Sequence, residues 1–468
     1  MFTVEEIARA TGGTVIGNKD AVVTGVSTDS RQVRAGEIFV ALKGASFDGH
    51  DYIAAAAERG VRVFLAEAGW AGRTRIPDGA SCIAVPDTLR GLGDVAAFHR
   101  KRFTIPVVGV TGSNGKTTTK EMLAAILART GPGLKTSGNL NNLIGLPQML
   151  LCLTEGDLWA VLEMGMSEPG EIDRLAELAM PAVGVITNAF PAHLESMGSV
   201  EAVARAKGEL FLRLPVGGCA VYNADDPLIA GSPSPEGVKR LSFGLHGADV
   251  SAGEIKGCGV NGQSFMLRLP GEHLPVRMKA FGVHNIYNAL AAAAAATALE
   301  VAPQMIRAGL EAFIPYEKRF NLEEVDGIIL IDDSYNANPA SMEAALVTLR
   351  DMKEECRAIA VLGDMLELGK GSPQAHRELG RLAASCADRL YVMGEMADLT
   401  AAGAAEAGLA SDEIIKAQSH EDILSDLRRT LTKGDYLLVK GSRGMRMETV
   451  AEGVRRGFDV VRMTEGAA

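Results

Sequence analysis

Residues 104–129 constrain the chain more than any other segment, because they join a strand, a tight turn and a helix in a fixed order. Residues 104–110 are apolar and β-branched, residues 111–116 form a glycine-containing turn, and residues 117–129 have helical character. Glycines let such a turn aim backbone N–H groups inward, and the N-terminus of the following helix favours an anion. The segment therefore predicts a phosphate-binding loop in an α/β fold.

The turn also supplies the side chains that a nucleoside triphosphate requires. Lys116 can reach the β- and γ-phosphates, and Thr117 can ligate Mg²⁺. Val110 stands where the strict loop pattern has a glycine, so the match is to the shortened variant GxxGKT. We expect ATP to contact the following residues: Thr111, Gly112, Ser113, Asn114, Gly115, Lys116, Thr117 and Thr118. The alternative is an ordinary strand–helix turn.

The remaining pattern predicts an α/β protein of three domains. At about 150 residues per domain, a chain of 468 residues has room for three. We expect a small α/β domain at residues 1–98, a central P-loop ATPase domain with a mostly parallel sheet at 99–313, and a Rossmann-like domain at 314–468, with a linker at 313–320. Strand-like runs alternate with helical segments. These runs lie at residues 21–26, 38–42, 61–65, 82–85, 159–163, 183–187, 219–222, 328–331, 358–362, 390–393 and 436–439.

Composition excludes several other classes of protein. The formal net charge is −11 and no basic run stands out, which argues against a nucleic-acid partner. Residues 289–299 are the longest apolar run and fall short of the roughly 20 residues that span a membrane. The six cysteines form no CxxC pair, so we expect free thiols rather than a zinc site or disulfides. With no signal-peptide pattern at the N-terminus, we expect a cytoplasmic protein.

Several further segments, taken in order, resemble the Mur ligase family across essentially the whole chain. They read TGSNGKTTTK at 111–120, TSGNLNNLIGLP at 136–147, LEMG at 162–165, TNAFPAHLE at 187–195, AKGEL at 206–210, YNADDP at 222–227 and GVHNIYNA at 282–289. The resemblance implies an ATP- and Mg²⁺-dependent ligase. In this family a substrate carboxylate attacks the γ-phosphate of ATP, and an amine then displaces phosphate from the acyl phosphate.

The outer blocks narrow the expected substrates. IDDSYNANPASM at 331–342, LGDMLELG at 362–369 and KGSRGMRME at 440–448 resemble family members that use D-alanyl-D-alanine as the amine. The acid partner would then be a UDP-N-acetylmuramoyl tripeptide ending in diaminopimelate or lysine. No arginine follows Pro339, unlike the DNPR-type segment of the ligases that add the third residue. STDSR at 27–31 and ALKGASFDGH at 41–50 resemble uridine-binding loops.

The resemblance also implies roles for individual residues. Catalysis would use Lys116, Lys207, His193 and Arg319, with Lys207 carbamylated by carbon dioxide. Metal binding would use Thr117, Glu163, His193 and Lys207. Nucleotide binding outside the loop would use Asn285, Asn288, Arg319 and Asp333. Substrate binding would use Ser27, Thr28, Asp29, Ser30, Arg31, Lys43, Gly44, Asp48, Gly49, His50, Asn139, Asn142, Tyr335, Asn336, Asn338, Lys440, Ser442 and Arg443.

Three competing interpretations remain at this point. Another Mur ligase, or the related folate polyglutamylating enzyme, would share the loop and the modified lysine, although the STDSR and YNANP segments disfavour folate. A regulatory or transport protein with a P-loop would bind nucleotide without ligation and would not need Glu163, His193 and Lys207 together. We further expect the protein to be a monomer. Its three blocks would move as rigid bodies and close around ATP, with Arg319 at the join between the second and third blocks.

Overall fold

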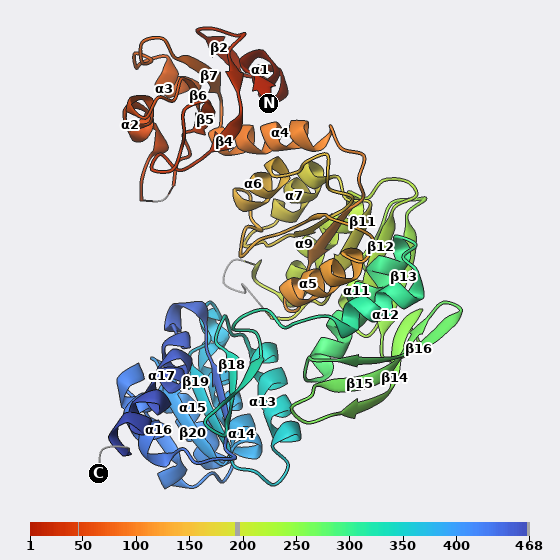
Figure 1. Cartoon of the computed structure of the whole chain (residues 1–468), viewed down its shortest axis with the longest axis vertical. Helices are drawn as coiled ribbons and strands as arrows, with labels where there is room; N and C mark the ends of the chain where they lie inside the picture. The colour runs from red at the N-terminus through yellow and green to blue at the C-terminus, as the bar shows by residue number, and fades with distance from the viewer. Residues whose placement is uncertain (45, 192–196, 466–468) are drawn as a thin grey trace.

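The computed structural model describes residues 1–44, 46–191 and 197–465, and the described strands fall into three larger sheets and one two-stranded ribbon. The sheets follow one another along the long axis of the molecule, with the N-terminal sheet at one end and the C-terminal sheet at the other (Figure 1). Helices cover the faces of mostly parallel strands. The predicted α/β class with three sheet-containing blocks is confirmed.

The N-terminal sheet has the strand order β2-β7-β6-β5-β4. β2 runs antiparallel to β7, and the other neighbours are parallel. Its strands are β2 (Thr14–Ile16), β4 (Gly25–Ser27), β5 (Glu37–Val40), β6 (Val63–Glu67) and β7 (Ser81–Val85), beside the ribbon of β1 (Phe2–Thr3) and β3 (Val22–Val23). The helices are α1 (Val4–Thr11), α2 (Ile53–Glu58), α3 (Ala68–Ala71) and α4 (Thr88–Arg100), with the 3₁₀ turn η1 (Gly49–Tyr52).

Helix α4 joins this block to the next one. It packs against α6 (Gly145–Leu151) and α7 (Glu171–Ala179) of the central block. The buried guanidinium of Arg100, at the end of α4, donates to the carbonyls of Ala179 at 3.0 Å and Ile105 at 3.1 Å. These bonds satisfy a charged group away from water and hold the end of α4 against the central block.

The central sheet has the order β16-β15-β14-β13-β12-β11-β8-β10-β9. The strands from β14 to β9 are parallel, and β14, β15 and β16 form an antiparallel extension of the sheet. The bounds are β8 (Val107–Thr111), β9 (Leu134–Lys135), β10 (Ala160–Glu163), β11 (Val183–Ile186), β12 (Cys219–Asn223), β13 (Lys239–Gly244), β14 (Val250–Gly257), β15 (Gln263–Leu269) and β16 (Glu272–Met278).

Two helical layers cover the central sheet. Helices α5 (Lys116–Leu127), α11 (Val283–Ala298) and α12 (Pro303–Glu311) share one apolar core with one face of the sheet. Helices α6, α7 and α9 (Val200–Leu212) pack on the other face, and the short α10 (Pro227–Ala230) follows β12. The alanines from Ala289 to Ala296 are fully buried, since their small side chains let α11 lie close to the sheet and to α5.

The C-terminal sheet has the order β17-β18-β22-β19-β20-β21, and only β17 is antiparallel to its neighbour. The strands are β17 (Asn321–Val325), β18 (Ile328–Asp333), β19 (Ala358–Gly363), β20 (Arg389–Met393), β21 (Ile414–Lys416) and β22 (Tyr436–Lys440). Helices α13 (Pro339–Lys353), α14 (Ser372–Cys386) and α15 (Ala397–Glu406) cover one face. Helices α16 (His420–Thr430) and α17 (Glu448–Glu465) cover the other. The connections after β18 and β22 therefore leave on opposite faces, which opens a crevice at their carboxyl ends.

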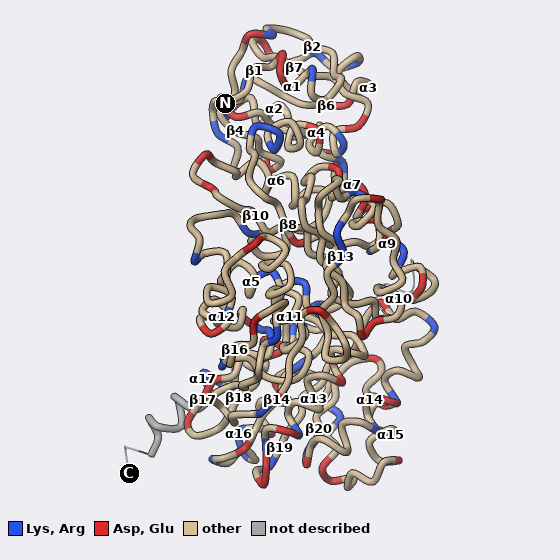
Figure 2. The backbone as a smooth tube through the Cα atoms, turned by 90° about the vertical axis from the view of Figure 1, so that its right-hand side faces the viewer, with Lys and Arg blue, Asp and Glu red and all other residues tan. Residues whose placement is uncertain are grey.

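None of the helices in the described ranges combines the length and the apolar character that a membrane crossing demands. Basic and acidic residues are interspersed along the chain, and basic segments lie beside α5 and α11 near the middle of the molecule (Figure 2).

Candidate functional site

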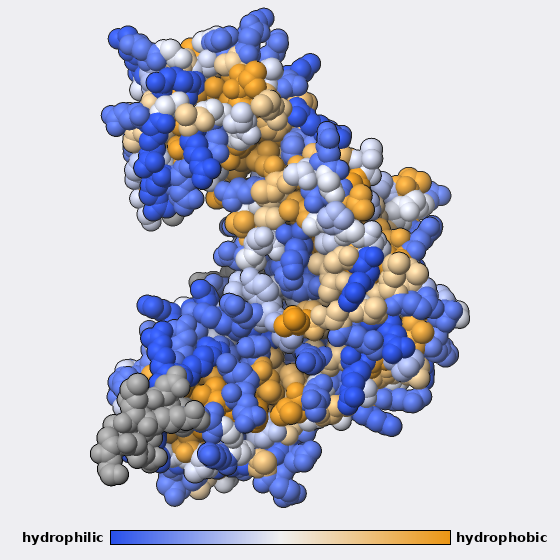
Figure 3. Space-filling model, in the orientation of Figure 1, coloured by the Kyte–Doolittle hydropathy of each residue, from blue (hydrophilic) through white to orange (hydrophobic). Residues whose placement is uncertain are grey.

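A cavity of about 1360 Å³ lies where the central block meets the C-terminal block. The phosphate loop, the first turn of α11 and the connection from β18 to α13 form its walls. Figure 3 shows a wider hollow on one side of the molecule, between the N-terminal block above and the C-terminal block below. The predicted site residues that line the cavity are Ser113, Asn114, Gly115, Lys116, Thr117, Thr118, Asn139, Asn142, Glu163, Asn285, Asn288, Arg319, Asp333, Tyr335, Asn336, Asn338 and Lys440.

The phosphate loop needs its two glycines because other parts of the central block press against it. Gly112 has φ 151° and Gly115 has φ 82°. A Cβ atom on Gly112 would lie 1.8 Å from Oγ1 of Thr187, and one on Gly115 would lie 2.1 Å from Oδ1 of Asn288. No side chain fits at either position, so both glycines are required for the tight turn of the loop.

The segment after β11 holds the loop from outside. The backbone N–H groups of Ser113 and Asn114 donate to the backbone and side-chain oxygens of Asn188 at 3.0 and 2.9 Å. Thr187 donates through Oγ1 to the carbonyl of Asn114 at 2.6 Å. This segment belongs to the motif at residues 187–195, in which no role was predicted for Thr187 or Asn188. Their contacts now show that they shape the loop.

Lys116 lies at the centre of the loop and folds back over it. Its ammonium donates to the carbonyls of Gly112 at 2.8 Å and Ser113 at 3.3 Å. Loss of hydration lowers the pKa of Lys116, Glu163 opposes that shift, and Arg319 adds to it. A phosphate placed in the loop would supply a stronger acceptor than these carbonyls, as charge-assisted bonds are roughly twice as strong as neutral ones.

Thr117 and Glu163 form an oxygen-rich corner beside the loop. Oγ1 of Thr117 donates to Oε2 of Glu163 at 2.9 Å, and Nδ2 of Asn141 donates to Oε1 at 2.8 Å. Glu163 is buried at the carboxyl end of β10. A hydroxyl and one carboxylate, completed by phosphate oxygens and water, are the ligand set that Mg²⁺ prefers. The donor set therefore fits Mg²⁺, although the described residues contain no cluster of three or more His, Cys, Asp or Glu side chains.

Asn141 was not predicted as a site residue, whereas its neighbours Asn139 and Asn142 were. Asn142 instead accepts the N–H groups of Ile144 and Gly145 at 3.1 and 2.8 Å and so caps the start of α6. His193, the other predicted metal-site residue, lies in segment 192–196, outside the described residues.

Lys207 lies on α9 and is 3% exposed. Burial lowers the pKa of its ammonium well below the usual value, and the nearby charge of Lys116 lowers it further. A neutral amine is the form that reacts with carbon dioxide to give a carbamate. The predicted carbamylation stays a prediction, and it has a physical basis in this burial.

Asn285 and Asn288, three residues apart, meet on one face of α11. Nδ2 of Asn288 donates to Oδ1 of Asn285 at 3.0 Å, and Nδ2 of Asn285 donates to the carbonyl of Phe281 at 2.8 Å. Their neighbour His284 also lines the cavity, and the sequence assigned it no role. Burial lowers the pKa of His284 to about 4, with Asp333 opposing the shift and Lys440 supporting it. His284 is therefore neutral at pH 7.

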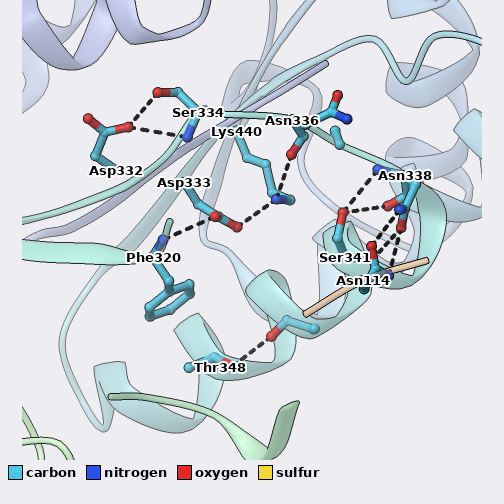
Figure 4. A network of polar contacts seen from close by, with 12 residues as sticks. Asn114, Phe320, Asp332, Asp333, Ser334, Asn336, Asn338, Ser341, Thr348 and Lys440 are labelled. Carbon is cyan, nitrogen blue, oxygen red and sulfur yellow. Dashed lines mark hydrogen bonds and ion pairs between the residues drawn. The ribbon is translucent and has the colours of Figure 1, made fainter. Parts of the chain in front are cut away.

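The C-terminal wall of the cavity contains an ion pair. Nζ of Lys440 lies 2.6 Å from Oδ2 of Asp333 and donates to the carbonyl of Asn336 at 3.0 Å (Figure 4). The backbone N–H of Phe320, in the predicted linker region, donates to the other oxygen of Asp333 at 3.0 Å. Asp333 and Lys440 end the adjacent parallel strands β18 and β22, so the sheet itself brings them together.

The ring of Tyr335 contacts two guanidinium groups. Cζ of Arg319 lies 4.1 Å from the centre of its ring, and Cζ of Arg443 lies 5.7 Å from it. Nε of Arg319 is buried and has no hydrogen-bond partner among the residues that the structure describes. Arg319 thus retains hydrogen-bonding capacity at the edge of the cavity.

Ser442 and Arg443 lie behind the ion pair. Ser442 is buried, accepts the N–H of Leu366 at 2.9 Å and donates to the carbonyl of Ala337 at 3.3 Å. The N–H of Arg443 donates to Oδ1 of Asn336 at 3.3 Å. These residues therefore support the connection from β18 to α13 that forms the cavity wall.

The predicted uridine-binding residues lie apart from the cavity in the N-terminal block. Oγ1 of Thr28 accepts a hydrogen bond from Nε2 of Gln148 in α6 at 2.9 Å. This bond places the turn at residues 27–31 against the central block. Arg31 pairs with Asp29 and holds the pKa of that carboxyl at about 2. The same turn contains Ser27 and Ser30, and the second loop contains Lys43, Gly44, Asp48, Gly49 and His50.

Two residues of the second loop are internal. The ring of His50 is buried, with Nδ1 paired to Asp48 at 2.5 Å and Nε2 accepting the N–H of Glu67 at 2.9 Å. A Cβ atom on Gly49 would lie 2.6 Å from the carbonyl oxygen of Leu42. These contacts hold the loop in shape, and its exposed residues are the ones free to meet a ligand.

Models of known protein families match three consecutive parts of the chain. The Mur ligase family catalytic domain matches residues 22–98, the Mur ligase middle domain matches 110–296, and the Mur ligase glutamate ligase domain matches 318–443. The UDP-N-acetylmuramoyl-tripeptide–D-alanyl-D-alanine ligase of Bacillus subtilis (strain 168) is 36% identical over 459 residues, which covers 96% of this chain and 97% of the relative.

Solved structures agree with these matches. A crystal structure of MurF from Acinetobacter baumannii superposes with a TM-score of 0.88 at 34% identity, covering 97% of this chain and 98% of that one. The MurF ligase from Thermotoga maritima in complex with ADP superposes with a TM-score of 0.84 at 30% identity, covering 94% and 99%.

Proposed function

The chain belongs to the Mur ligase family, and we propose that it joins D-alanyl-D-alanine to the terminal carboxylate of a UDP-N-acetylmuramoyl tripeptide at the expense of ATP. The reaction is a step of peptidoglycan precursor synthesis. The observation that carries this proposal is the cavity that the phosphate loop shares with the Asp333–Lys440 pair of the C-terminal block. A nucleotide-binding protein without ligase activity would not need a second, cation-bearing wall opposite its phosphates.

The reaction has two chemical steps. An oxygen of the tripeptide carboxylate attacks the γ-phosphorus of ATP, the bond to the β-phosphate oxygen breaks, and ADP leaves. The amine of D-alanyl-D-alanine then attacks the acyl carbon, the bond from carbon to the phosphate oxygen breaks, and phosphate and one proton leave. Both steps concentrate negative charge in one place, so fixed cations lower their barriers.

Side chains of this protein supply those cations and the positions of the reactants. Lys116 binds the γ-phosphate from within the loop. Arg319 lines the same cavity from the C-terminal block, its buried Nε has no hydrogen-bond partner among the described residues, and its guanidinium would supply a second cation for the same charge. Thr117 and Glu163 would hold Mg²⁺, which supplies charge neutralisation at the phosphates when it is bound. Lys207, once carbamylated, and His193 would complete that metal site.

The substrates occupy different blocks in this proposal. Residues 1–98 bind the UDP part of the acid substrate, residues 99–313 bind ATP, and residues 314–468 bind the dipeptide. Lys440 and Arg443 suit the dipeptide carboxylate, while Asn285, Asn288 and Asp333 suit the nucleoside. The phosphate loop, Glu163 and the Asp333–Lys440 pair all belong to one chain, so we propose that a monomer suffices for the activity. We propose that the reaction takes place in the cytoplasm, where ATP and nucleotide-linked precursors are available.

A substrate matrix tests the proposal. The purified protein is incubated with ATP, each candidate acid and each candidate amine, and both phosphate release and the mass of the product are measured. We expect phosphate and product only when the UDP-linked tripeptide and D-alanyl-D-alanine are both present. Equal phosphate release without the dipeptide, or a folate product, would contradict the assignment.

A further inference from the structure

Asn114 of the phosphate loop and Asn338 of the C-terminal block form a reciprocal amide pair across the cavity. Nδ2 of Asn338 donates to Oδ1 of Asn114 at 2.7 Å, and Nδ2 of Asn114 donates to Oδ1 of Asn338 at 3.2 Å (Figure 4). The two residues are 224 positions apart in the sequence. The pair therefore links the nucleotide side of the cavity directly to the opposite wall.

The Asn114 side of the pair is fixed to the central block. Its N–H donates to Asn188, and its carbonyl accepts Oγ1 of Thr187 at 2.6 Å and Nδ2 of Asn188 at 3.2 Å. With the backbone committed in this way, only the side chain of Asn114 is available to the other block. The side chain of Asn114 therefore moves together with the loop that would hold the γ-phosphate.

The Asn338 side is fixed to the start of α13. Oδ1 of Asn338 accepts the N–H of Ser341 at 2.9 Å, and the N–H of Asn338 donates to Oγ of Ser341 at 2.9 Å. This capping box fixes the side chain of Asn338. Two residues earlier, Asn336 is bound by Lys440 and Arg443. The connection 336–338 therefore joins the cations that suit the dipeptide to the phosphate loop.

We propose that Asn338 is a positioning residue that sets the separation between the γ-phosphate and the amine, and that it acts through Asn114 rather than through contact with the dipeptide. This inference rests on the proposed function. The two hydrogen bonds between these side-chain amides form at only one separation of the two residues. The attacking nucleophile and the acyl carbon must approach within about 3–3.5 Å to react. The pair of Asn114 and Asn338 thereby sets the distance between the γ-phosphate site and the amine.

Three variants separate this role from the alternatives. Asn338→Asp retains the oxygen that caps Ser341 but loses the donor and sets a carboxylate against Oδ1 of Asn114. Asn114→Ala removes the partner. Ser341→Ala removes the hydroxyl of the capping box but keeps the Ser341 N–H that Oδ1 of Asn338 accepts, so it controls for fraying of α13. Asn338→Ser, which also caps helices but is too short to reach Asn114, replaces Asn338→Asp if that variant does not fold.

The experiment measures kcat and the KM values for ATP and D-alanyl-D-alanine in all variants and in the double variant Asn114→Ala/Asn338→Asp. We expect Asn338→Asp to lower kcat about tenfold or more, the fold-change for roughly one hydrogen bond, with the dipeptide KM changed less than about threefold. The double variant should be no worse than Asn114→Ala, and Ser341→Ala should keep kcat within about twofold.

Two results would overturn the inference. One is a dipeptide KM raised more than about tenfold at unchanged kcat in Asn338→Asp, which would show direct contact with the dipeptide. The other is multiplication of the two single effects in the double variant, which would show independent roles. Failure of the unmodified protein to form product would instead contradict the proposed function, so the two failures are distinguishable.

Discussion

The hydroxyl of Thr117, in the first turn of α5, donates to the carboxylate of Glu163, at the end of β10, over 2.9 Å. Two residues 46 positions apart thus share one corner beside the phosphates. We predict that Glu163→Gln, which keeps the shape and an oxygen acceptor, raises the Mg²⁺ concentration for half-maximal activity at least about tenfold, because the anionic ligand is lost.

The check is a Mg²⁺ titration of activity, together with Mn²⁺ binding measured by electron paramagnetic resonance in the presence of ADP. Asn142→Ala is a matched control, since Asn142 caps α6 and does not bond Glu163. An unchanged metal requirement in Glu163→Gln would remove Glu163 from the metal site.

Lys116→Ala should abolish ligation. The variant loses the cation that lies over the phosphate loop, and one such group is worth roughly 3 kcal/mol or more in the transition state, about a hundredfold in rate. Ligation rates and ADP affinity are measured side by side. Activity within about tenfold of the unmodified protein would mean that the loop does not bind the γ-phosphate.

Lys207→Ala should be nearly inactive and should regain part of its activity when small carboxylates are added. Burial lowers the pKa of this amine well below its usual value, which favours the neutral form that accepts carbon dioxide, and a carboxylate in the vacated space would replace the carbamate. Intact-protein mass and ¹³C magnetic resonance with labelled bicarbonate detect the modification. A fully active protein with an unmodified amine at this position would refute it.

The stability of the protein should fall between pH 6.5 and 4 partly because of His284. Its pKa is about 4 in the folded protein, against an ordinary value of about 6.5. In that window the unfolded chain binds a proton that the folded chain does not, so the free energy of unfolding rises with pH. The contribution lost on acidification is at most about 3 kcal/mol.

The comparison is the pH dependence of the free energy of unfolding in the unmodified protein and in His284→Gln, which cannot titrate. The variant should lose less stability between pH 7 and pH 4.5. Parallel curves for the two proteins would show that His284 has the same pKa in both states.

The sequence predicted the parts of the fold that depend on local pattern. The strand and helix around the phosphate loop, β8 and α5, follow from β-branched residues, glycines and helical periodicity within a short window. β17 was missed, because Glu323 and Glu324 in a short edge strand look like loop residues. β21 was missed because Ile414–Lys416 is too short to show a period.

Site residues could be predicted from the sequence where the chemistry requires a residue type at a fixed spacing. They could not be predicted where segments far apart in the sequence meet. Motif matching named Asn139 and Asn142, yet the bond to Glu163 comes from Asn141, because a loop conformation decides which amide turns inward. The pair of Asn114 and Asn338 depends on how two blocks dock, which no local pattern encodes. Likewise, the burial of Lys207 follows from the packing of α9 on the sheet.

The most direct test of the acyl phosphate route follows oxygen atoms. The UDP-linked tripeptide is labelled with ¹⁸O in its terminal carboxylate and incubated with the protein, ATP, Mg²⁺ and D-alanyl-D-alanine, and the released phosphate is analysed by mass spectrometry. We expect one ¹⁸O in the phosphate for each amide bond formed, since the carboxylate oxygen that attacks the γ-phosphorus leaves with it. Product accompanied by unlabelled phosphate would contradict the route and the roles assigned to the cavity.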